Sequence, residues 1–154
     1  MLIEYKLIIK YIMKILCISK NIIDINLNNS WLAGFTDSEG CFTVSTIKST
    51  KFNSTQVTVR YILSQKGELE LLNKIALLLN GKVHYVKSYD GYNMVVNLTK
   101  LNNILNYLKI HKLKTKKLIS YNNWLKVYDL VKSKQHLTPS GLEKINVLKK
   151  KINK

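Results

Sequence analysis

The sequence predicts an α+β domain in which helices cover one face of a four-stranded antiparallel sheet. Two pairs of strand-like segments are each joined by a short polar turn, so each pair is expected to form a hairpin with one apolar face. Amphipathic helical segments precede, separate and follow the hairpins, which gives the order α-β-β-α-β-β-α. Packing the helices against one side of the sheet buries the apolar faces of both.

The expected elements follow one another with short connections. In chain order they are a helix at 31–39, strands at 41–47 and 56–64, a helix at 67–80, strands at 82–89 and 92–98, and helices at 99–109, at 114–135 and from 139 onward. Ser30 is a favourable N-cap for the first helix, and Gly40 ends that helix. The strands after it are rich in β-branched and aromatic residues, and a polar turn at 48–54 joins them.

Glycines mark the ends of the next two elements. The second helix has an apolar stripe at helical spacing, and Gly81 ends it. Asp90 and Gly91 predict a two-residue hairpin turn, because both positions tolerate positive φ. The alternation after this turn leaves the faces of Tyr92 and Met94 undecided. The stripe of the second helix consists of Leu69, Leu72, Ala76 and Leu79.

The C-terminal third of the chain is expected to be helical. Thr99 caps the first of its helices, and Thr138 followed by Pro139 marks the start of the last one. The tail at 142–154 is expected to lie against the body of the domain or beside bound DNA. The longest helix carries an apolar stripe of Leu118, Tyr121, Leu125 and Tyr128.

The charge of the chain predicts a polyanionic partner. The 154 residues carry a formal net charge of +16, which favours nucleic acid, with an anionic membrane surface as the runner-up. No apolar run approaches the roughly 20 residues of a spanning helix, so we expect no membrane insertion. Cys17 and Cys41 lack disulfide or metal spacing, which indicates free thiols in a reducing compartment.

Two units are expected, an N-terminal extension at 1–28 and one domain at 29–154. The extension is apolar but is interrupted by Lys6, Lys10 and Lys14, which would form one cationic stripe on a helix. An amphipathic targeting helix, an extra docking helix and the remnant of an upstream reading frame remain open as explanations. The abundance of Ile, Asn and Lys suggests an A/T-rich genome, so we expect an organelle-encoded, mitochondrial protein.

Two acids lie where the first helix gives way to a strand. The carbonyl end of a helix carries partial negative charge, so Asp37 and Glu39 are unfavourable there unless a cation joins them. One interpretation is a core helix followed by two solvated acids. The other is a divalent-metal site.

The same stretch resembles the motif of the LAGLIDADG homing endonucleases. Leu32, Ala33, Gly34, Asp37 and Gly40 match the letters of the family name, and Glu39 is a carboxylate where the name has Asp. The resemblance extends from about Ser30 through the long helix. It implies a saddle-shaped DNA-binding sheet with helices on its other face. It also implies metal-dependent hydrolysis of both strands of a long DNA site.

The resemblance also implies roles for individual residues. Glu39 and the backbone carbonyl of Ser38 would bind Mg²⁺, or another divalent cation such as Mn²⁺. Gln65 would order the attacking water, and Lys116 would stabilise charge on the phosphate; taken alone, both are ordinary polar surface positions. Because one carboxylate makes a thin metal site and only one motif is present, a homodimer and a near-palindromic target are expected. The residues assigned to the dimer interface are Trp31, Ala33, Gly34 and Asp37.

Sequence readout is expected from the concave face of the sheet laid in the major groove of double-stranded DNA. Gln and Arg suit adenine and guanine edges respectively. Lys48 and Lys51 are expected to contact phosphates instead. The expected base readers are Thr43, Ser45, Gln56, Thr58, Arg60, Tyr85 and Lys87.

Other functions remain open at this point. A catalytically silent relative that binds intron RNA as a splicing maturase would keep the fold without needing Glu39. One lobe of a two-lobe protein with a different partner and a basic DNA-binding module without catalysis are further alternatives. Other nuclease types fit poorly, because the three histidines form no cluster with cysteines or with one another.

Overall fold

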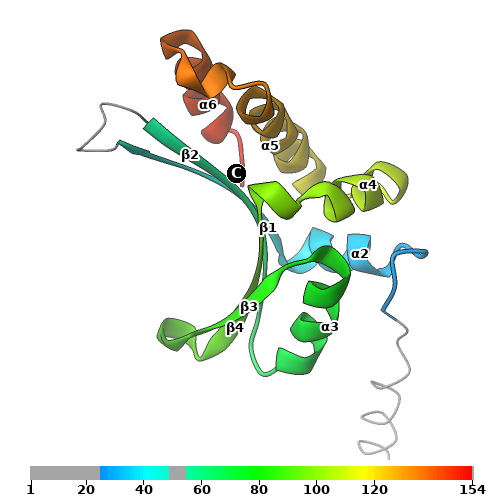
Figure 1. The fold of residues 1–154 in the computed structure, drawn as a ribbon. Helices are drawn as coiled ribbons and strands as arrows, with labels where there is room; N and C mark the ends of the chain where they lie inside the picture. The colour runs from blue at the N-terminus through cyan, green and yellow to red at the C-terminus, as the bar shows by residue number, and fades with distance from the viewer. Residues whose placement is uncertain (1–24, 49–54, 154) are drawn as a thin grey trace, which may run out of the picture.

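The computed structural model describes residues 25–48 and 55–153. Its four strands form one antiparallel sheet in the order β1-β2-β4-β3. Helices cover one face of the sheet, and the other face is concave and open (Figure 1). The strands are β1 Gly40–Lys48, β2 Thr55–Gln65, β3 Lys82–Val86 and β4 Gly91–Asn97. The α-helices of these residues are α2 Trp31–Glu39, α3 Leu69–Leu79, α4 Asn102–Ile110, α5 Lys117–Lys132 and α6 Pro139–Lys149. The predicted α+β fold class is therefore confirmed.

The core lies between the helices and the covered face of the sheet. Trp124 of α5 is its largest fully buried side chain, and its ring centroid lies 5.1 Å from that of Phe42 in β1. Its indole N–H donates to the backbone oxygen of Thr43 at 3.2 Å, so the buried nitrogen is satisfied. Burying side chains of this size contributes about 1.5–3 kcal/mol each, which fixes α5 against the sheet.

The second helix differs from its prediction at both ends. α3 ends at Asn80, which adopts the left-handed conformation at φ 55°, and not at Gly81. Gly81 is instead needed for close packing, because a Cβ there would lie 2.6 Å from the sulfur of Met94. Leu69 is exposed, and Ile75 joins the buried stripe in its place.

The second hairpin is not joined by a two-residue turn. A short 3-10 helix, Lys87–Tyr89, follows β3, and Asp90 then turns in the left-handed conformation at φ 51°. Gly91 already belongs to β4 and pairs with Val86. The faces left undecided by the sequence are settled: Met94 and Val96 are buried under the helices.

Two of the three C-terminal helices, α4 and α5, begin later than predicted. Thr99 lies within a 3-10 helix, Leu98–Lys100, and α4 starts only at Asn102. The buried face of α5 centres on Trp124 and Val127, with Leu118 and Leu125 only partly buried. The α6 start is confirmed, because Thr138 Oγ1 accepts a hydrogen bond from the N–H of Gly141 at 3.1 Å.

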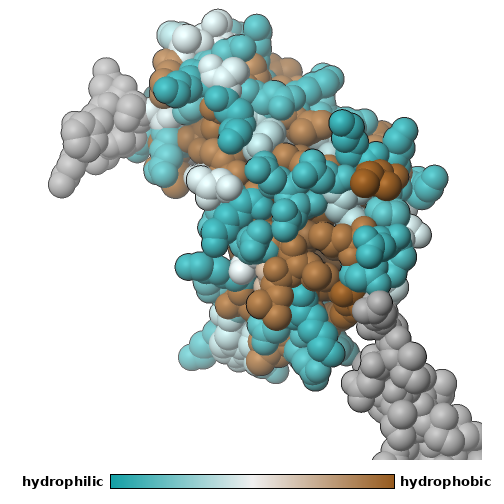
Figure 2. Space-filling view, turned by 45° about the vertical axis from the view of Figure 1, so that its right-hand side comes forward, coloured by the Kyte–Doolittle hydropathy of each residue, from teal (hydrophilic) through white to brown (hydrophobic). Residues whose placement is uncertain are grey.

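Part of the surface is apolar. In Figure 2, apolar side chains gather in the lower part of the molecule, over α2 and α3. Within the residues described here, no helix has the length and apolarity required to cross a membrane.

The predicted extension at 1–28 lies almost wholly outside the described residues, as does most of the predicted turn at 48–54.

Candidate active site and nucleic-acid interface

The motif helix runs straight into the sheet. α2 ends at Glu39, and Gly40 begins β1 in an extended conformation while its N–H still donates to Thr36 O. A Cβ on Gly40 would lie 2.6 Å from both the oxygen and the Cγ2 of Thr36. A glycine is therefore required for the helix and the strand to meet this closely.

A buried hydroxyl pair holds the middle of α2. Thr36 Oγ1 lies 2.7 Å from the hydroxyl of Tyr61 in β2, and both side chains are fully buried. Because the single hydroxyl hydrogen of Thr36 donates to Leu32 O at 2.7 Å, Tyr61 donates to Thr36. Burial raises the pKa of the Tyr61 hydroxyl well above its usual range, so this phenol stays protonated.

The start of α2 is capped differently from the prediction. Ser30 occupies the N-cap position, but its side chain makes no capping hydrogen bond. The side chain of Asn29 accepts from the N–H of Trp31 at 3.0 Å instead. The hydroxyl of Tyr107 in α4 accepts from the N–H of Ala33 and donates to Asn29 O, both at 2.8 Å. A residue far along the chain therefore satisfies the first turn.

Asp37 ties a lysine-rich turn to the end of α2. Its carboxylate accepts from the N–H of Lys114 at 2.8 Å and from the N–H and hydroxyl of Thr115 at 3.3 and 2.8 Å. These contacts lie within one chain. The Asp37 carboxylate is therefore engaged within its own chain, and its assignment to the dimer interface stays a prediction.

An open pocket forms where α2, β1 and α5 meet. The carboxylate of Glu39 is exposed there, and no hydrogen bond or ion pair to it is present among residues 25–48 and 55–153. Gln65 ends β2 at the same end of the sheet, since Gly40 pairs with Leu63, but it does not line the pocket. The pocket is lined by Asp37, Glu39, Gly40, Cys41, Thr115, Lys116, Lys117, Ser120 and Asn153.

Three hydrogen bonds fix the far wall of this pocket. The ammonium of Lys117 donates to Gly40 O at 2.6 Å, which places its positive charge at the carbonyl end of α2. Asn153 donates through its backbone N–H to Ser120 Oγ and through its side chain to Phe42 O, at 2.9 and 2.7 Å. The tail therefore lies against the body. The sequence singled out Lys116, but the contact to Gly40 belongs to its neighbour.

The donor set suits half of a metal site. Glu39 offers a carboxylate, and Ser38 lies in the last helical turn, where carbonyl oxygens lack partners within the helix. Such oxygens are ligands that Mg²⁺ and Mn²⁺ accept. Within the described part of the chain, no group of three or more His, Cys, Asp or Glu side chains gathers to hold a metal alone.

One side of α2 is partly open to solvent. Trp31 and Phe35 pack against the core and stack with ring centroids 5.1 Å apart, and Gly34 and Ser38 beside them are exposed. A Cβ on Gly34 would meet nothing within 4 Å. Ala33, predicted at the interface, is instead only 4% exposed and packs inside its own chain.

The concave face is mainly polar, with Ile62 and Val95 among its apolar residues, and it carries no acid from any strand. Strand pairing places Thr43 beside Arg60 and Ser45 beside Thr58, with Gln56 further along the same face. No strand contains Asp or Glu, whereas Arg60 and Lys82 place positive charge on the concave face. Five of the predicted readers, Thr43, Ser45, Gln56, Thr58 and Arg60, therefore share this face.

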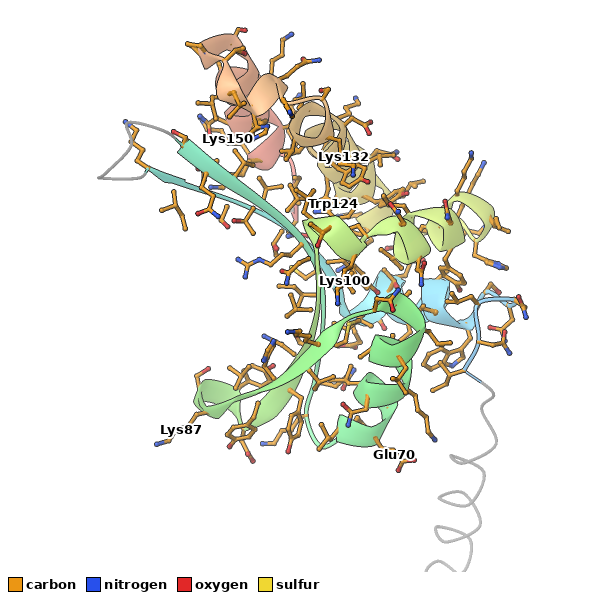
Figure 3. All side chains as sticks on the ribbon, viewed as in Figure 1. Glu70, Lys87, Lys100, Trp124, Lys132 and Lys150 are labelled. Atoms are coloured by element: carbon orange, nitrogen blue, oxygen red, sulfur yellow. The ribbon has the colours of Figure 1, made fainter. Side chains whose placement is uncertain are left out.

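The remaining predicted readers lie elsewhere. Tyr85 pairs with Tyr92 on the face that the helices cover, where its hydroxyl donates to Asp90 at 2.9 Å, so its expected place on the concave face is wrong. Lys87 projects from the turn between β3 and β4 (Figure 3). Lys48 ends β1 and is exposed, and Lys51 lies outside the described residues.

Sequence reasoning missed the contribution of the second hairpin to the concave face. Its neighbour relations place Lys82, His84, Asn93 and Asn97 there, with Ser64 of β2 opposite Asn93. The alternation of residues in β4 indicates which of them share a face. The position of the turn at 87–90 was also needed to show that Asn93 and Asn97 face the concave side. Tyr89 in that turn gave no signal in the sequence, although it reaches Asn93.

An open, basic sheet beside a carboxylate at a helix end is typical of proteins that process nucleic acids. The family model described as LAGLIDADG endonuclease matches residues 32–128, which include α2, the whole sheet, α3, α4 and most of α5. The chain belongs to the LAGLIDADG endonuclease family.

Fungal proteins are among its relatives. Probable intron-encoded endonuclease 4 of Neurospora crassa is 50% identical over 129 residues, which cover 84% of this chain and 24% of that protein. The uncharacterized cox1 intron-2 37.2 kDa protein of Schizosaccharomyces pombe is 36% identical over 121 residues, covering 78% of this chain and 36% of that protein. This chain therefore spans about a quarter to a third of these relatives.

Solved structures share the fold. The homing endonuclease I-LtrWI bound to its target DNA is 32% identical with a TM-score of 0.77, over 86% of this chain and 45% of that chain. The homing endonuclease I-TnaI is 25% identical with a TM-score of 0.77, over 86% of this chain and 90% of that chain. This chain thus corresponds to nearly all of one of these proteins and to less than half of the other.

Proposed function

We propose that this chain is one lobe of a sequence-specific endonuclease that cuts both strands of a long, near-palindromic DNA site. The observation that carries the proposal is the carboxylate of Glu39, which is exposed and without a partner among the described residues. It lies where the motif helix reaches the sheet, beside Lys116 and Lys117. A phosphodiester laid along the sheet would meet these groups together.

The proposed cation ligands are Glu39 and the backbone carbonyl of Ser38. When bound, Mg²⁺ or Mn²⁺ would supply an activated water and stabilise the departing 3′ oxygen. Because one chain offers so few oxygen donors, the remaining ligands would be phosphate oxygens and the equivalent acid of a second lobe.

The other pocket residues act on charge and orientation. Lys117 is held at Gly40 O and Lys116 extends from the same wall, so both place positive charge near the scissile phosphate. Positive charge fixed in advance stabilises the transition state without reorganisation. Gln65, at the same end of the sheet, is proposed to orient the attacking water.

The second lobe is proposed to be another copy of the chain. The open side of α2 offers the bare backbone of Gly34 beside the partly buried rings of Trp31 and Phe35, so a second motif helix can approach closely. Pairing around a twofold axis would bring two Glu39 carboxylates together. The match to nearly all of I-TnaI supports a single-lobe chain, and the half-length match to I-LtrWI supports the need for two lobes.

The concave face is proposed to read the DNA sequence in the major groove. Arg60 suits guanine and Gln56 suits adenine, with Thr43, Ser45 and Thr58 beside them. The exposed Lys48 would contact phosphates, and Lys87 in the turn between β3 and β4 is still proposed as a base reader. The intron-encoded relatives support the proposal that this chain is likewise encoded in an organelle intron.

The proposal is tested by cutting a randomised DNA library. The chain is incubated with the library and Mg²⁺, and the ends of cut molecules are sequenced. Paired cuts within one recurring, near-palindromic sequence are expected, together with their disappearance in EDTA. Recurrent binding of a sequence without any cut ends, or preferential binding of RNA, would contradict the nuclease proposal and favour a silent or RNA-binding relative.

A further inference from the structure

Asn93 lies on the concave face, on one of the two inner strands of the sheet. It lies in β4 between Ser64 of β2 and His84 of β3, in register with both. Since β2 and β4 are the two inner strands, Asn93 has a neighbouring strand on each side, close to the end of β2 at Gln65. A ligand laid along the sheet would pass directly over its side chain.

Two hydroxyl groups hold the amide oxygen of Asn93. Ser64 Oγ and the hydroxyl of Tyr89 each donate to Oδ1 at 2.6 Å. Such short distances are typical of O–H···O bonds and are shorter than those of N–H···O bonds, so the oxygen and not the nitrogen faces the hydroxyls. A carbonyl oxygen has two lone pairs, so both are occupied.

The shape of the preceding turn brings Tyr89 to this position. Asp90 turns in the left-handed conformation, and the ring of Tyr89 occupies the space where a Cβ of Gly91 would be. The ring therefore lies over Gly91 on the concave face, and only glycine at that position allows it. The hydrogen bond from Tyr89 to Asn93 is thus formed by the hairpin itself, before any ligand binds.

The amide nitrogen of Asn93 is left for a ligand. No hydrogen bond engages Nδ2 anywhere in the stretches 25–48 and 55–153. With its oxygen saturated, the side chain can only donate, through two N–H bonds on one atom. A free asparagine amide, in contrast, donates and accepts together and pairs with adenine.

We propose that Asn93 is a specificity-determining residue that acts as a donor only and recognises a base edge rich in acceptors. In the major groove guanine presents two adjacent acceptors, N7 and O6, and thymine presents O4, whereas cytosine presents an N4 donor. Asn93 therefore selects guanine or thymine and rejects cytosine at one position of each half-site. This inference rests on the proposed function, because it requires DNA on the concave face.

The test is selection of bound DNA from a randomised library in buffer without magnesium, so that the DNA stays intact. The parent chain is expected to enrich guanine or thymine at one half-site position. Asn93→Asp replaces the donor by an acceptor, so it is expected to shift that position toward cytosine by about tenfold. Ser64→Ala combined with Tyr89→Phe frees the amide oxygen, so the same position is expected to gain adenine.

Asn106→Asp is the matched control, because it makes the same charge change on the exposed side of α4, away from the sheet. Its selected sequence is expected to equal that of the parent. If the DNA selected by the parent chain shows no base preference at any position, the proposed function itself is contradicted. A clear parent preference that both the Asn93→Asp and the double variant retain unchanged would overturn the inference alone. If Asn93→Asp abolishes DNA binding, the uncharged double variant Ser64→Ala with Tyr89→Phe, or Tyr89→Phe alone, provides the test. A gain of adenine at the same half-site position supports the inference, and an unchanged preference overturns it.

Discussion

At the scale of single residues, two glycines of the motif helix have opposite roles. Gly40 faces its own chain, where a side chain would collide with Thr36 at the junction of α2 and β1. Gly34 faces outward, where a side chain would meet open space. One glycine is needed to fold a single chain, and the other is needed for the proposed approach of a second helix.

Gly40→Ala is expected to lower the free energy of unfolding by about 1–3 kcal/mol, the usual cost of forcing an extra methyl group into a packed site. Its φ of −70° is accessible to alanine, so the cost is steric. Urea unfolding followed by circular dichroism measures the change.

Gly34→Ala is the matched control. The methyl group has room, and alanine is favoured over glycine within a helix by up to about 1 kcal/mol. We expect this variant to be as stable as the parent or slightly more stable. If both variants lose the same stability, the predicted collision between a side chain at position 40 and Thr36 is contradicted.

The residue types of the site were predictable, but the division of labour among them was not. The motif spacing placed Glu39 at the helix end from sequence alone. That Asp37 binds the turn at Lys114 and Thr115, and that Lys117 contacts Gly40, depends on where α5 begins. The sequence started this helix three residues too early, so the lysines could not be told apart.

At the scale of secondary-structure elements, tyrosines from distant segments hold the motif helix. Tyr61 of β2 bonds to Thr36 in its middle, and Tyr107 of α4 bonds to its first turn. Burial raises the pKa of both hydroxyls and also that of Tyr121 in α5. In the folded state these three hydroxyl groups therefore keep their protons to a higher pH than they do in the unfolded chain.

These raised pKa values predict a loss of stability in alkali. An unfolded tyrosine releases its proton near pH 10, whereas the folded chain keeps it to higher pH. Above about pH 10 the folded state therefore binds more protons than the unfolded state, and the free energy of unfolding falls as pH rises. Below that pH the contribution is complete and constant.

Tyr61→Phe tests this coupling. The variant is expected to lose about 1 kcal/mol at pH 7, because the hydrogen bond to Thr36 is removed. It is also expected to show a shallower decline than the parent between pH 10 and 12 in urea titrations. A decline as steep as that of the parent would contradict the role of the buried Tyr61 hydroxyl.

Strands were easier to predict than turns and helix starts. The alternation of Gln56, Thr58 and Arg60 with buried neighbours fixed the face of β2 correctly. Tyr85 was assigned to the wrong face because the true turn spans four residues and shifts the phase of the hairpin. The start of α2 depends on Tyr107, a long-range partner that no local pattern reveals.

At the scale of the whole molecule, the two faces of the sheet divide folding from function. Helices and core lie on one side (Figure 1), and the open concave side carries mainly basic and neutral polar groups. A net charge of +16 favours a polyanionic partner, and the acid-free strands suit the concave face to the proposed binding of nucleic acid. Glu39 places the proposed chemistry at the point where two such chains would meet.

The measurement that tests this account most directly compares Glu39→Gln with Glu143→Gln on the DNA site selected from the library. Both changes remove one negative charge from an exposed position, but Glu143 lies on α6, outside the candidate site. Because metal ligation supplies several kcal/mol of transition-state stabilisation, Glu39→Gln is expected to slow cleavage by more than about a hundredfold. Binding in gel-shift experiments is expected to persist. Glu143→Gln is expected to cut like the parent, and cleavage by Glu39→Gln at the parent rate would contradict the account.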